Sequence, residues 1–378
     1  MSRLELIATS TFGLESIVAG EIKALGYSDV KVENGKVTFT ADERAICRTN
    51  LWLRTADRVR LKVGEFKAVT FDQLFEKTKA LPWPDLLPRE AAFPVDGKSV
   101  QSTLFSISDC QAIVKKAVVE SMKKQYRTEW FKENGPLYRI EVSLLKDTAT
   151  LTIDTSGPGL HKRGYRSGGS EAPLRETLAA ALVMLARWKP DITLIDPFCG
   201  SGTIPIEAAM MGQNIAPGME REFTSESWPI IPRECWHEAR RETHEEADYN
   251  RELDITGTDI DPRAINTARK NAARAMVDHA IHFQERPLSE LSSKKKYGKI
   301  ICNPPYGERL SELKEVEQLY KEMGKIFKKL DTWSFYILTA HENFESLFGK
   351  KASKRRKLYH GNIKVHYYQY YGPRPPRR

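Results

Sequence analysis

A glycine-containing junction between a strand and a helix constrains the fold of this chain more than any other feature. Residues 192–195 form a short apolar run, Gly200 and Gly202 follow it, and residues 204–211 suit a helix. Glycines at such a junction permit a tight turn and let a ligand approach the backbone closely. Further strand-like runs alternate with helical segments, near residues 254, 281 and 298. This alternation predicts an α/β domain with a doubly wound, mostly parallel sheet.

The order of these strands predicts where a ligand binds. A doubly wound sheet places its first four strands in the order 3-2-1-4, so the first and fourth are neighbours at the topological switch. The glycine loop and the segment after residue 302 then meet at one crevice, although about 100 residues separate them in the sequence. We expect the functional site there.

The segment Asn303-Pro304-Pro305-Tyr306 is suited to hold an amino nitrogen. It follows the apolar run 299–302, and its two prolines end the strand and fix an extended turn. The amide of Asn303, the carbonyl of Pro304 and the ring of Tyr306 offer two acceptors and a flat surface, as an exocyclic base amine requires. A plain strand-ending turn with a surface tyrosine has the same sequence, so the rest of the chain must decide.

The glycine loop suits a nucleoside ligand better than a dinucleotide or a nucleoside triphosphate. A nicotinamide fingerprint would place a third glycine where this chain has Pro205, and a phosphate-binding loop would require Gly-Lys-Ser/Thr. Asp196, at the end of the preceding strand, is placed either to bind an amino group of the ligand or to cap the turn. Asp259 ends the next strand, where a carboxylate accepts both ribose hydroxyls. Asp261 is predicted to cap the helix that begins at Pro262.

The first 155 residues have a different organisation. Residues 1–66 read as strand, helix, strand, strand, helix, strand, which is a ferredoxin-like order. Residues 67–155 predict a second α+β unit, with a helix near 70–79, a strand near 91–94, a helix at 108–126 and a hairpin at 138–153. A glycine-rich linker at 156–170 then leads to the α/β domain, 171–378, in which residues 212–251 form a long insertion.

Positive charge is concentrated at the C-terminal end. Residues 349–378 contain 10 basic and no acidic residues, which exceeds the net charge of +9 for the whole chain. A basic tail of this kind suits a polyanion such as RNA, although a solvated basic end is the alternative. For the basic positions of the long helix, periodicity alone favours a solvated helix face. The candidate RNA-binding residues are Lys98, Ser102, Gln111, Lys115, Lys116, Arg355 and Arg356.

Composition excludes several other classes of protein. Five scattered cysteines without a C-x-x-C pair argue for a reducing cytoplasm and against a structural zinc site. His237 and His244 do not have the spacing of a zinc motif, so no metal is expected. No signal peptide and no membrane-spanning run is expected from the sequence.

Two motifs carry a resemblance to a known family. Residues 196–207 (DPFCGSGTIPIE) together with 303–309 (NPPYGER) resemble class I S-adenosylmethionine-dependent RNA methyltransferases that carry a THUMP domain. The bacterial large-subunit ribosomal RNA guanine-N2 methyltransferases are the most similar members. The likeness covers nearly the whole chain, including the linker residues 160–166 and the segment 172–176 that opens the catalytic domain.

The resemblance implies a cofactor, a substrate and a set of roles. Asn303 and the Pro304 carbonyl would receive the target amine, Pro305 would fix the turn, and Tyr306 would stack on the base. S-adenosylmethionine would be bound by Asp196, Phe198, Gly200, Gly202 and Asp259. Many relatives have an aspartate near the adenine where this chain has Gln284 and Glu285, so that contact stays open between the two.

Three other functions are compatible with these residues. The segment 303–306, which we call the clamp, can hold the N6 amine of adenine in RNA or DNA in the same way. An RNA-binding ribosome-assembly factor with little methyltransferase activity is a second possibility, although the intact glycine loop, Asp259 and the clamp argue against it. Methylation of a protein glutamine amide is a third, for which RNA-binding domains would be superfluous.

Overall fold

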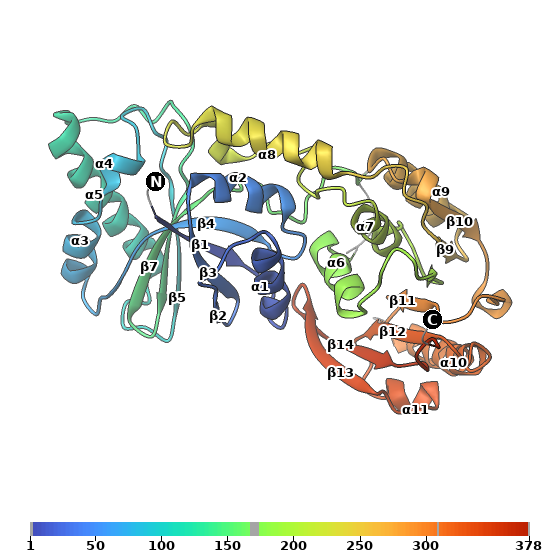
Figure 1. The fold of residues 1–378 in the computed structure, drawn as a ribbon. Helices are drawn as coiled ribbons and strands as arrows, with labels where there is room; N and C mark the ends of the chain where they lie inside the picture. The colour runs from blue at the N-terminus through green and yellow to red at the C-terminus, as the bar shows by residue number, and fades with distance from the viewer. Residues whose placement is uncertain (1–2, 167–173, 308–309, 377–378) are drawn as a thin grey trace. The chain divides into compact units, whose positions relative to one another are not determined.

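The computed structural model describes residues 3–166, 174–307 and 310–376 (Figure 1). These residues divide into two compact units, which we call the N-terminal and the C-terminal unit. The N-terminal unit contains Met1–Ser10, Ala19–Leu160 and Arg221–Glu242. The C-terminal unit contains Thr11–Val18, His161–Glu220 and Thr243–Arg378. The chain therefore passes between the two units several times.

The first part of the chain has the predicted ferredoxin-like order. Asp42 caps the second helix by accepting a hydrogen bond from the Ala45 amide at 3.2 Å, as expected from the sequence. The elements are β1 (Leu4–Thr9), α1 (Glu15–Ala24), β2 (Lys31–Glu33), β3 (Lys36–Ala41), α2 (Glu43–Trp52) and β4 (Arg58–Lys67).

The second part extends the same sheet. Strand β4 pairs antiparallel with β7, giving seven strands in the order β2-β3-β1-β4-β7-β6-β5. The elements are α3 (Phe71–Lys79), α4 (Trp83–Leu86), β5 (Val95–Val100), α5 (Ile107–Tyr126), β6 (Ile140–Leu145) and β7 (Thr148–Asp154). The strand expected near 91–94 is wrong: Ala92 makes only an isolated bridge, and the strand begins at Val95. As an edge strand, β5 can be polar, so its sequence lacks the apolar run that sheet-centre strands need.

Part of the long insertion belongs to the N-terminal unit. It contains a 3-10 turn, η1 (Thr224–Ser227), and helix α8 (Arg233–Glu246) as far as Glu242. The Trp228 ring stacks on Tyr138 with centroids 4.4 Å apart, and its indole N–H donates to the Leu137 carbonyl at 2.9 Å. Glu242 forms an ion pair with Arg48 at 2.6 Å. A domain boundary at residue 171 therefore misses a segment that completes the N-terminal unit.

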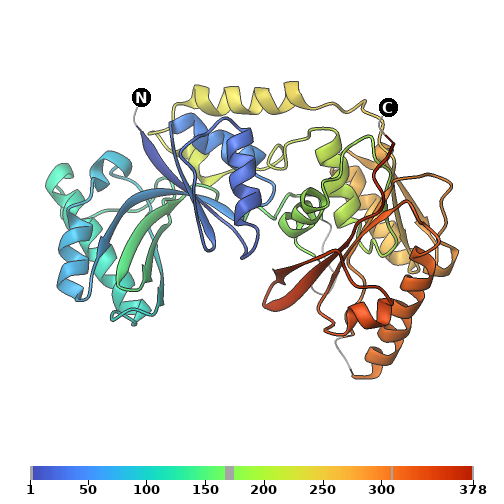
Figure 2. The ribbon, with the colours of Figure 1, turned by 60° about the horizontal axis from the view of Figure 1, so that its bottom comes forward.

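The C-terminal unit contains a second sheet of seven strands, in the order β10-β9-β8-β11-β12-β14-β13 (Figures 1 and 2). The first four follow the predicted order 3-2-1-4, and β10 to β12 run parallel. The strands are β8 (Leu194–Asp196), β9 (Ile255–Asp259), β10 (Ile281–Glu285), β11 (Lys299–Cys302), β12 (Ser334–Thr339), β13 (Lys354–His360) and β14 (Ile363–Tyr370). The helices are α6 (Glu176–Leu185), α7 (Thr203–Gly212), α9 (Pro262–Arg274), α10 (Leu310–Phe327) and α11 (Phe344–Phe348), with 3-10 turns η2 (Asp278–Ala280) and η3 (Leu288–Glu290).

The expectation of a basic tail from residue 349 is wrong for most of that segment. Residues 354–370 form the antiparallel hairpin β13–β14 at one edge of the sheet (Figure 2). Leu358, Val365 and Tyr367 are fully buried, whereas Lys354, Arg355 and Lys357 are exposed. Apolar side chains on one face drive this segment into the sheet, and cations on an edge strand oppose unwanted strand pairing.

The predicted linker is partly built into the C-terminal unit. Arg163 is buried and its guanidinium lies 3.4 Å from the Glu207 carboxylate, which also accepts a hydrogen bond from the Tyr165 hydroxyl at 3.1 Å. Glu207 is completely buried on α7. A buried charge needs such partners, so residues 161–166 are fixed by their contacts. Linker residues 167–170, and residues 171–173 at the expected start of the catalytic domain, lie outside the described residues.

Candidate active site

Parallel pairing of β8 with β11 brings the glycine loop and the Asn-Pro-Pro-Tyr segment together. Lys299 lies opposite Leu194 and Ile300 opposite Ile195, so both segments leave the same edge of the sheet. Burial raises the pKa of the Cys302 thiol well above its usual value, and the nearby Asp196 charge raises it further. The two segments predicted to line the crevice at the topological switch therefore follow neighbouring parallel strands.

The two loop glycines have conformations that other residues rarely adopt. Gly200 has φ +50° and Gly202 has φ +83°. A Cβ atom on Gly202 would lie 3.0 Å from Cβ of Ala268 and 3.0 Å from Cζ of Phe283. Gly202 is thus required both by its left-handed backbone and by close packing against α9 and β10.

Asp259 faces this loop. Its Oδ2 accepts a hydrogen bond from the Gly200 amide at 2.9 Å, and its Oδ1 accepts from the Asp261 amide at 3.0 Å. Each carboxylate oxygen has a second lone pair, which suits the ribose role predicted for this residue. Asp261 accepts from the Arg263 amide at 2.8 Å and caps α9, with Pro262 in the first turn, as predicted.

Asp196 is buried at the end of β8. Its Oδ1 accepts a hydrogen bond from the Phe198 amide at 3.1 Å, so the turn-capping contact is present. Burial raises the pKa of Asp196 well above its usual value, and the negative charge of Asp259 adds to that effect. A cationic group of a ligand would relieve the cost of a charge at this position.

Gln284 and Glu285 lie at the carboxyl end of β10. In the parallel pairing, Gln284 is opposite Thr258 and Glu285 is opposite Asp259. The Arg286 amide donates to the Asp259 carbonyl at 2.9 Å, which fixes the chain after the strand. Both candidates for the adenine contact are therefore next to the predicted ribose site.

The Asn-Pro-Pro-Tyr segment is held by a buried tyrosine that the sequence analysis missed. The Tyr306 hydroxyl donates to Oδ1 of Asn303. The Tyr320 hydroxyl, on α10, donates to the Pro305 carbonyl at 2.7 Å and is 2.9 Å from Oγ1 of Thr339. Tyr320 and Thr339 are completely buried. This contact ties the turn to the carboxyl end of β12, and nothing in the sequence around Tyr320 indicates it.

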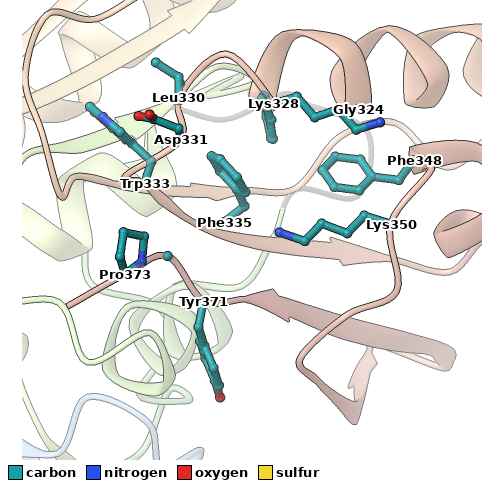
Figure 3. Close-up of a pocket in the computed structure, with 12 residues that line it drawn as sticks. Gly324, Lys328, Leu330, Asp331, Trp333, Phe335, Phe348, Lys350, Tyr371 and Pro373 are labelled. Atoms are coloured by element: carbon teal, nitrogen blue, oxygen red, sulfur yellow. The ribbon is translucent and has the colours of Figure 1, made fainter.

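A pocket of about 390 Å³ lies beside Tyr306. It is lined by residues that follow β11 and β12 and by the start of β14, so it is at the carboxyl edge of the sheet. A second pocket, of about 270 Å³, is lined by Trp333, Phe335 and Tyr371, among others (Figure 3). Trp333 and Phe335 are at the amino end of β12. Because ligands of doubly wound sheets bind at the carboxyl ends, the first of these two pockets is the better placed for a substrate.

Several candidate RNA-binding residues of the N-terminal unit have partners within that unit. The Lys115 amine donates to the Phe93 carbonyl at 3.0 Å and contacts Glu133 at 2.5 Å, and burial lowers its pKa. Lys98 pairs with Glu141 at 2.9 Å. Ser102 donates to the Val100 carbonyl at 3.1 Å.

The remaining candidates are distributed over both units. Gln111 and Lys116 are on α5, and Lys116 is exposed. Arg355 and Arg356 are on the edge strand β13. The five candidates of the N-terminal unit do not make one unpaired basic face, and their contact with RNA stays a prediction.

The second sheet and its glycine loop define a class I methyltransferase fold. The RMKL-like methyltransferase domain matches residues 163–369, the RlmL ferredoxin-like domain residues 5–60 and the THUMP domain residues 68–154. The chain belongs to this family of RMKL-like methyltransferases, which confirms the resemblance found in the sequence.

Three relatives illustrate the similarity. YpsC of Bacillus subtilis (strain 168), whose RNA methyltransferase assignment is itself a proposal, is 54% identical over 380 residues, covering 100% of this chain and 98% of YpsC. A Listeria monocytogenes structure, described as a predicted N6-adenine-specific DNA methylase, is 55% identical with TM-score 0.95, covering 99% and 97% of the two chains. The methyltransferase-like protein SMU.472, solved with S-adenosylhomocysteine (SAH), is 46% identical with TM-score 0.94 and full coverage of both chains.

Over residues 3–166, 174–307 and 310–376, no helix is long and apolar enough to cross a membrane. Within the same ranges, no group of three or more His, Cys, Asp or Glu side chains is arranged to hold a metal ion.

Proposed function

We propose that this protein transfers a methyl group from S-adenosylmethionine to an exocyclic base amine in RNA, specifically N2 of a guanine in large-subunit ribosomal RNA. The observation that supports the proposal is the parallel pairing of β8 with β11, because the loop that contains Gly200 and Gly202 and the segment that begins at Asn303 follow these two neighbouring strands. The similarity to YpsC and the matched THUMP domain support RNA as the substrate.

The residues of the loop fit S-adenosylmethionine by their chemistry. Gly200 and Gly202 permit close approach to the backbone, Asp259 offers acceptors for ribose hydroxyls, and the buried Asp196 offers a carboxylate for the ammonium group. SMU.472 binds SAH, the product form of this cofactor. When bound, S-adenosylmethionine supplies a methyl group already activated by its sulfonium centre.

The Asn303 segment supplies orientation and charge stabilisation. A base amine is a poor nucleophile because its lone pair is delocalised into the ring. Acceptance of both N–H bonds by Asn303 Oδ1 and the Pro304 carbonyl favours a pyramidal nitrogen and stabilises the positive charge that develops on it. The C–N bond forms as the C–S bond breaks, and the amine then loses one proton to solvent.

The Tyr306 hydroxyl shares the acceptor proposed for the amine. It donates to Asn303 Oδ1 in this structure, and the second lone pair of that oxygen is the one that would accept from the amine. The ring of Tyr306 is then available to stack on the extracted base, a contact worth about 1–3 kcal/mol per base. The Tyr306 side chain thus contacts the acceptor when no base is bound and stacks on the base once it has entered.

Asn303→Ala tests the clamp directly. We expect turnover to fall by about 10²–10³-fold or more, because a preorganised acceptor is lost from the transition state, while binding of SAH measured by calorimetry is unchanged. Asn266→Ala, an exposed asparagine on α9, is the matched control and is expected to keep full activity. Near-normal methylation by Asn303→Ala would show that the clamp is not used.

Nucleoside mass spectrometry identifies the product. Ribosomal RNA from a deletion strain is compared with wild-type RNA, and then methylated in vitro with the purified protein. Loss and restoration of N2-methylguanosine supports the proposal. N6-methyladenosine as the product would favour the second candidate, adenine-N6 transfer, which the description of the Listeria relative favours. Absence of any product with cofactor bound would indicate a ribosome-assembly factor.

A further inference from the structure

The pocket beside Tyr306 has an unusual charge for an RNA-binding site. Among the described residues that line it, Glu342 carries the one carboxylate, and no lysine or arginine is present. The neighbouring hairpin β13–β14 is strongly basic. A carboxylate repels phosphate, so an acidic side chain lowers RNA affinity here unless it meets a hydrogen-bond donor of the substrate.

The bases that carry an exocyclic amine differ in the groups beside that amine. In guanine the N2 amine is flanked by the N1–H donor and the N3 acceptor. In adenine the N6 amine is flanked by two acceptors, N1 and N7. In cytosine the N4 amine is flanked by the N3 acceptor and a C–H. A carboxylate, which only accepts hydrogen bonds when ionised, therefore pairs favourably with guanine alone.

We propose that Glu342 accepts the N1–H of a guanine whose N2 amine is held by Asn303, and that this side chain makes the site select guanine over adenine. The inference rests on the proposed function, because it concerns the base received by the same clamp. It assigns a specificity-determining role to a residue that the catalytic motifs do not include.

The segment that carries Glu342 is anchored to the clamp through one side chain. The amide of His341 donates to Oγ1 of Thr339 at 3.1 Å, and Thr339 is 2.9 Å from the Tyr320 hydroxyl. The same hydroxyl donates to the Pro305 carbonyl at 2.7 Å. The His341 ring also packs edge-on against the ring of Tyr320, with centroids 5.6 Å apart. A common anchor therefore fixes the two turns that would face one base.

The other lining residues suit a flat ring with a polar edge. Tyr306, Leu313 and Ile363 supply apolar surface, and Ile363 is 42% exposed. The volume of about 390 Å³ lies within the range of about 300–1,000 Å³ for ligand pockets. Asn343, next to Glu342, has an amide that donates to carbonyl oxygens, and guanine O6 is such an acceptor.

A base-substitution experiment tests the assignment. The substrates are a synthetic RNA hairpin with the guanosine mapped by mass spectrometry, and the same hairpin with 2-aminopurine at that position. 2-Aminopurine keeps the N2 amine but has an acceptor at N1 and lacks O6. For the wild-type protein we expect kcat/KM to fall by about 10–100-fold on 2-aminopurine, the size of a lost hydrogen bond to a charged group.

Glu342→Gln is expected to remove most of that preference. Its kcat/KM on guanosine should fall by about 10-fold, whereas on 2-aminopurine it should be unchanged or higher, because the new amide N–H can donate to N1. Glu315→Gln, which removes an exposed carboxylate on α10 outside the pocket, is the matched control and should keep the wild-type ratio. SAH affinity and thermal unfolding, measured on each variant, confirm that the fold is kept.

The outcomes separate this inference from the proposed function. If the wild-type protein makes N2-methylguanosine but the ratio of the two substrates is the same in Glu342→Gln, the proposed function stands and Glu342 does not read N1–H. If both rates fall equally in Glu342→Gln, its role is structural and the inference is again refuted. If the wild-type product is N6-methyladenosine, the proposed function fails first.

Discussion

Tyr320→Phe tests whether the clamp must be held in place to work. The substitution removes one hydroxyl from a completely buried side chain and leaves the ring, so packing is conserved. It deletes the 2.7 Å hydrogen bond to the Pro305 carbonyl and the 2.9 Å contact with Thr339. Asn303 and Tyr306 themselves are unchanged.

The expected fall in kcat follows from the loss of these two contacts. The Pro305 carbonyl loses this donor, and the buried Thr339 loses a partner. One lost hydrogen bond costs about 0.5–1.5 kcal/mol, and a buried group left unpaired adds to that cost. A total of about 1–2 kcal/mol corresponds to a 5–30-fold fall in kcat if the turn is needed in the transition state.

Steady-state methyl transfer to ribosomal RNA, with SAH binding measured by calorimetry, gives the answer. We expect kcat to fall while the cofactor affinity and the RNA KM stay near wild type. Tyr370→Phe is the control, because Tyr370 is buried in the same core and its hydroxyl donates to the Lys350 carbonyl at 3.2 Å, away from the clamp. Equal loss of stability in both variants, with kcat unchanged in Tyr320→Phe, would refute the positioning role.

Two further predictions concern the N-terminal unit and the cofactor loop. Trp228→Ala should lower the free energy of unfolding by about 3–5 kcal/mol in urea titrations, because Trp228 is 1% exposed and stacked on Tyr138. Trp130 is 79% exposed, so the control Trp130→Ala should change that free energy by less than about 0.5 kcal/mol. SAH affinity should rise with pH as Asp196 ionises, because burial and then Asp259 hold its pKa well above the usual value and only the carboxylate attracts an ammonium group. Asp196→Asn should bind more weakly and lose this pH dependence in calorimetry, and a wild-type pH profile in that variant would contradict the assigned contact.

The local sequence was sufficient to predict the structure where one residue type has a strong preference for one local conformation. Gly200 and Gly202 adopt left-handed conformations that few other residues tolerate, and Asp42 and Asp261 cap helices by contacts two or three residues away. The order of strands followed because right-handed crossovers leave few alternatives for alternating strands and helices. These constraints predict that the glycine loop and the segment from Asn303 follow neighbouring strands, as the pairing of β8 with β11 has them.

Long-range contacts between polar side chains had no such signal. Tyr320, on α10, contacts Pro305, which lies 15 positions earlier in the sequence. The pattern of this helix is amphipathic with or without the hydroxyl. The basic run at 354–357 has the composition of a tail, but the strand that contains it is decided by Leu358 and by the buried face of β14. The prediction of a tail followed from the density of positive charge, whereas the fold of this segment follows from the burial of its apolar side chains.

The contact of Trp228 with Tyr138 has a consequence for synthesis on the ribosome. The nascent N-terminal unit reaches residue 160 without the segment 221–242 that completes it. At about 5–20 residues per second, the remaining stretch of roughly 80 residues takes about 4–16 s to be made. During that interval the face of Tyr138 that later stacks on the indole has no cover. The N-terminal unit therefore cannot complete its fold when residue 160 has been made, and its completion waits for a segment encoded within the methyltransferase domain.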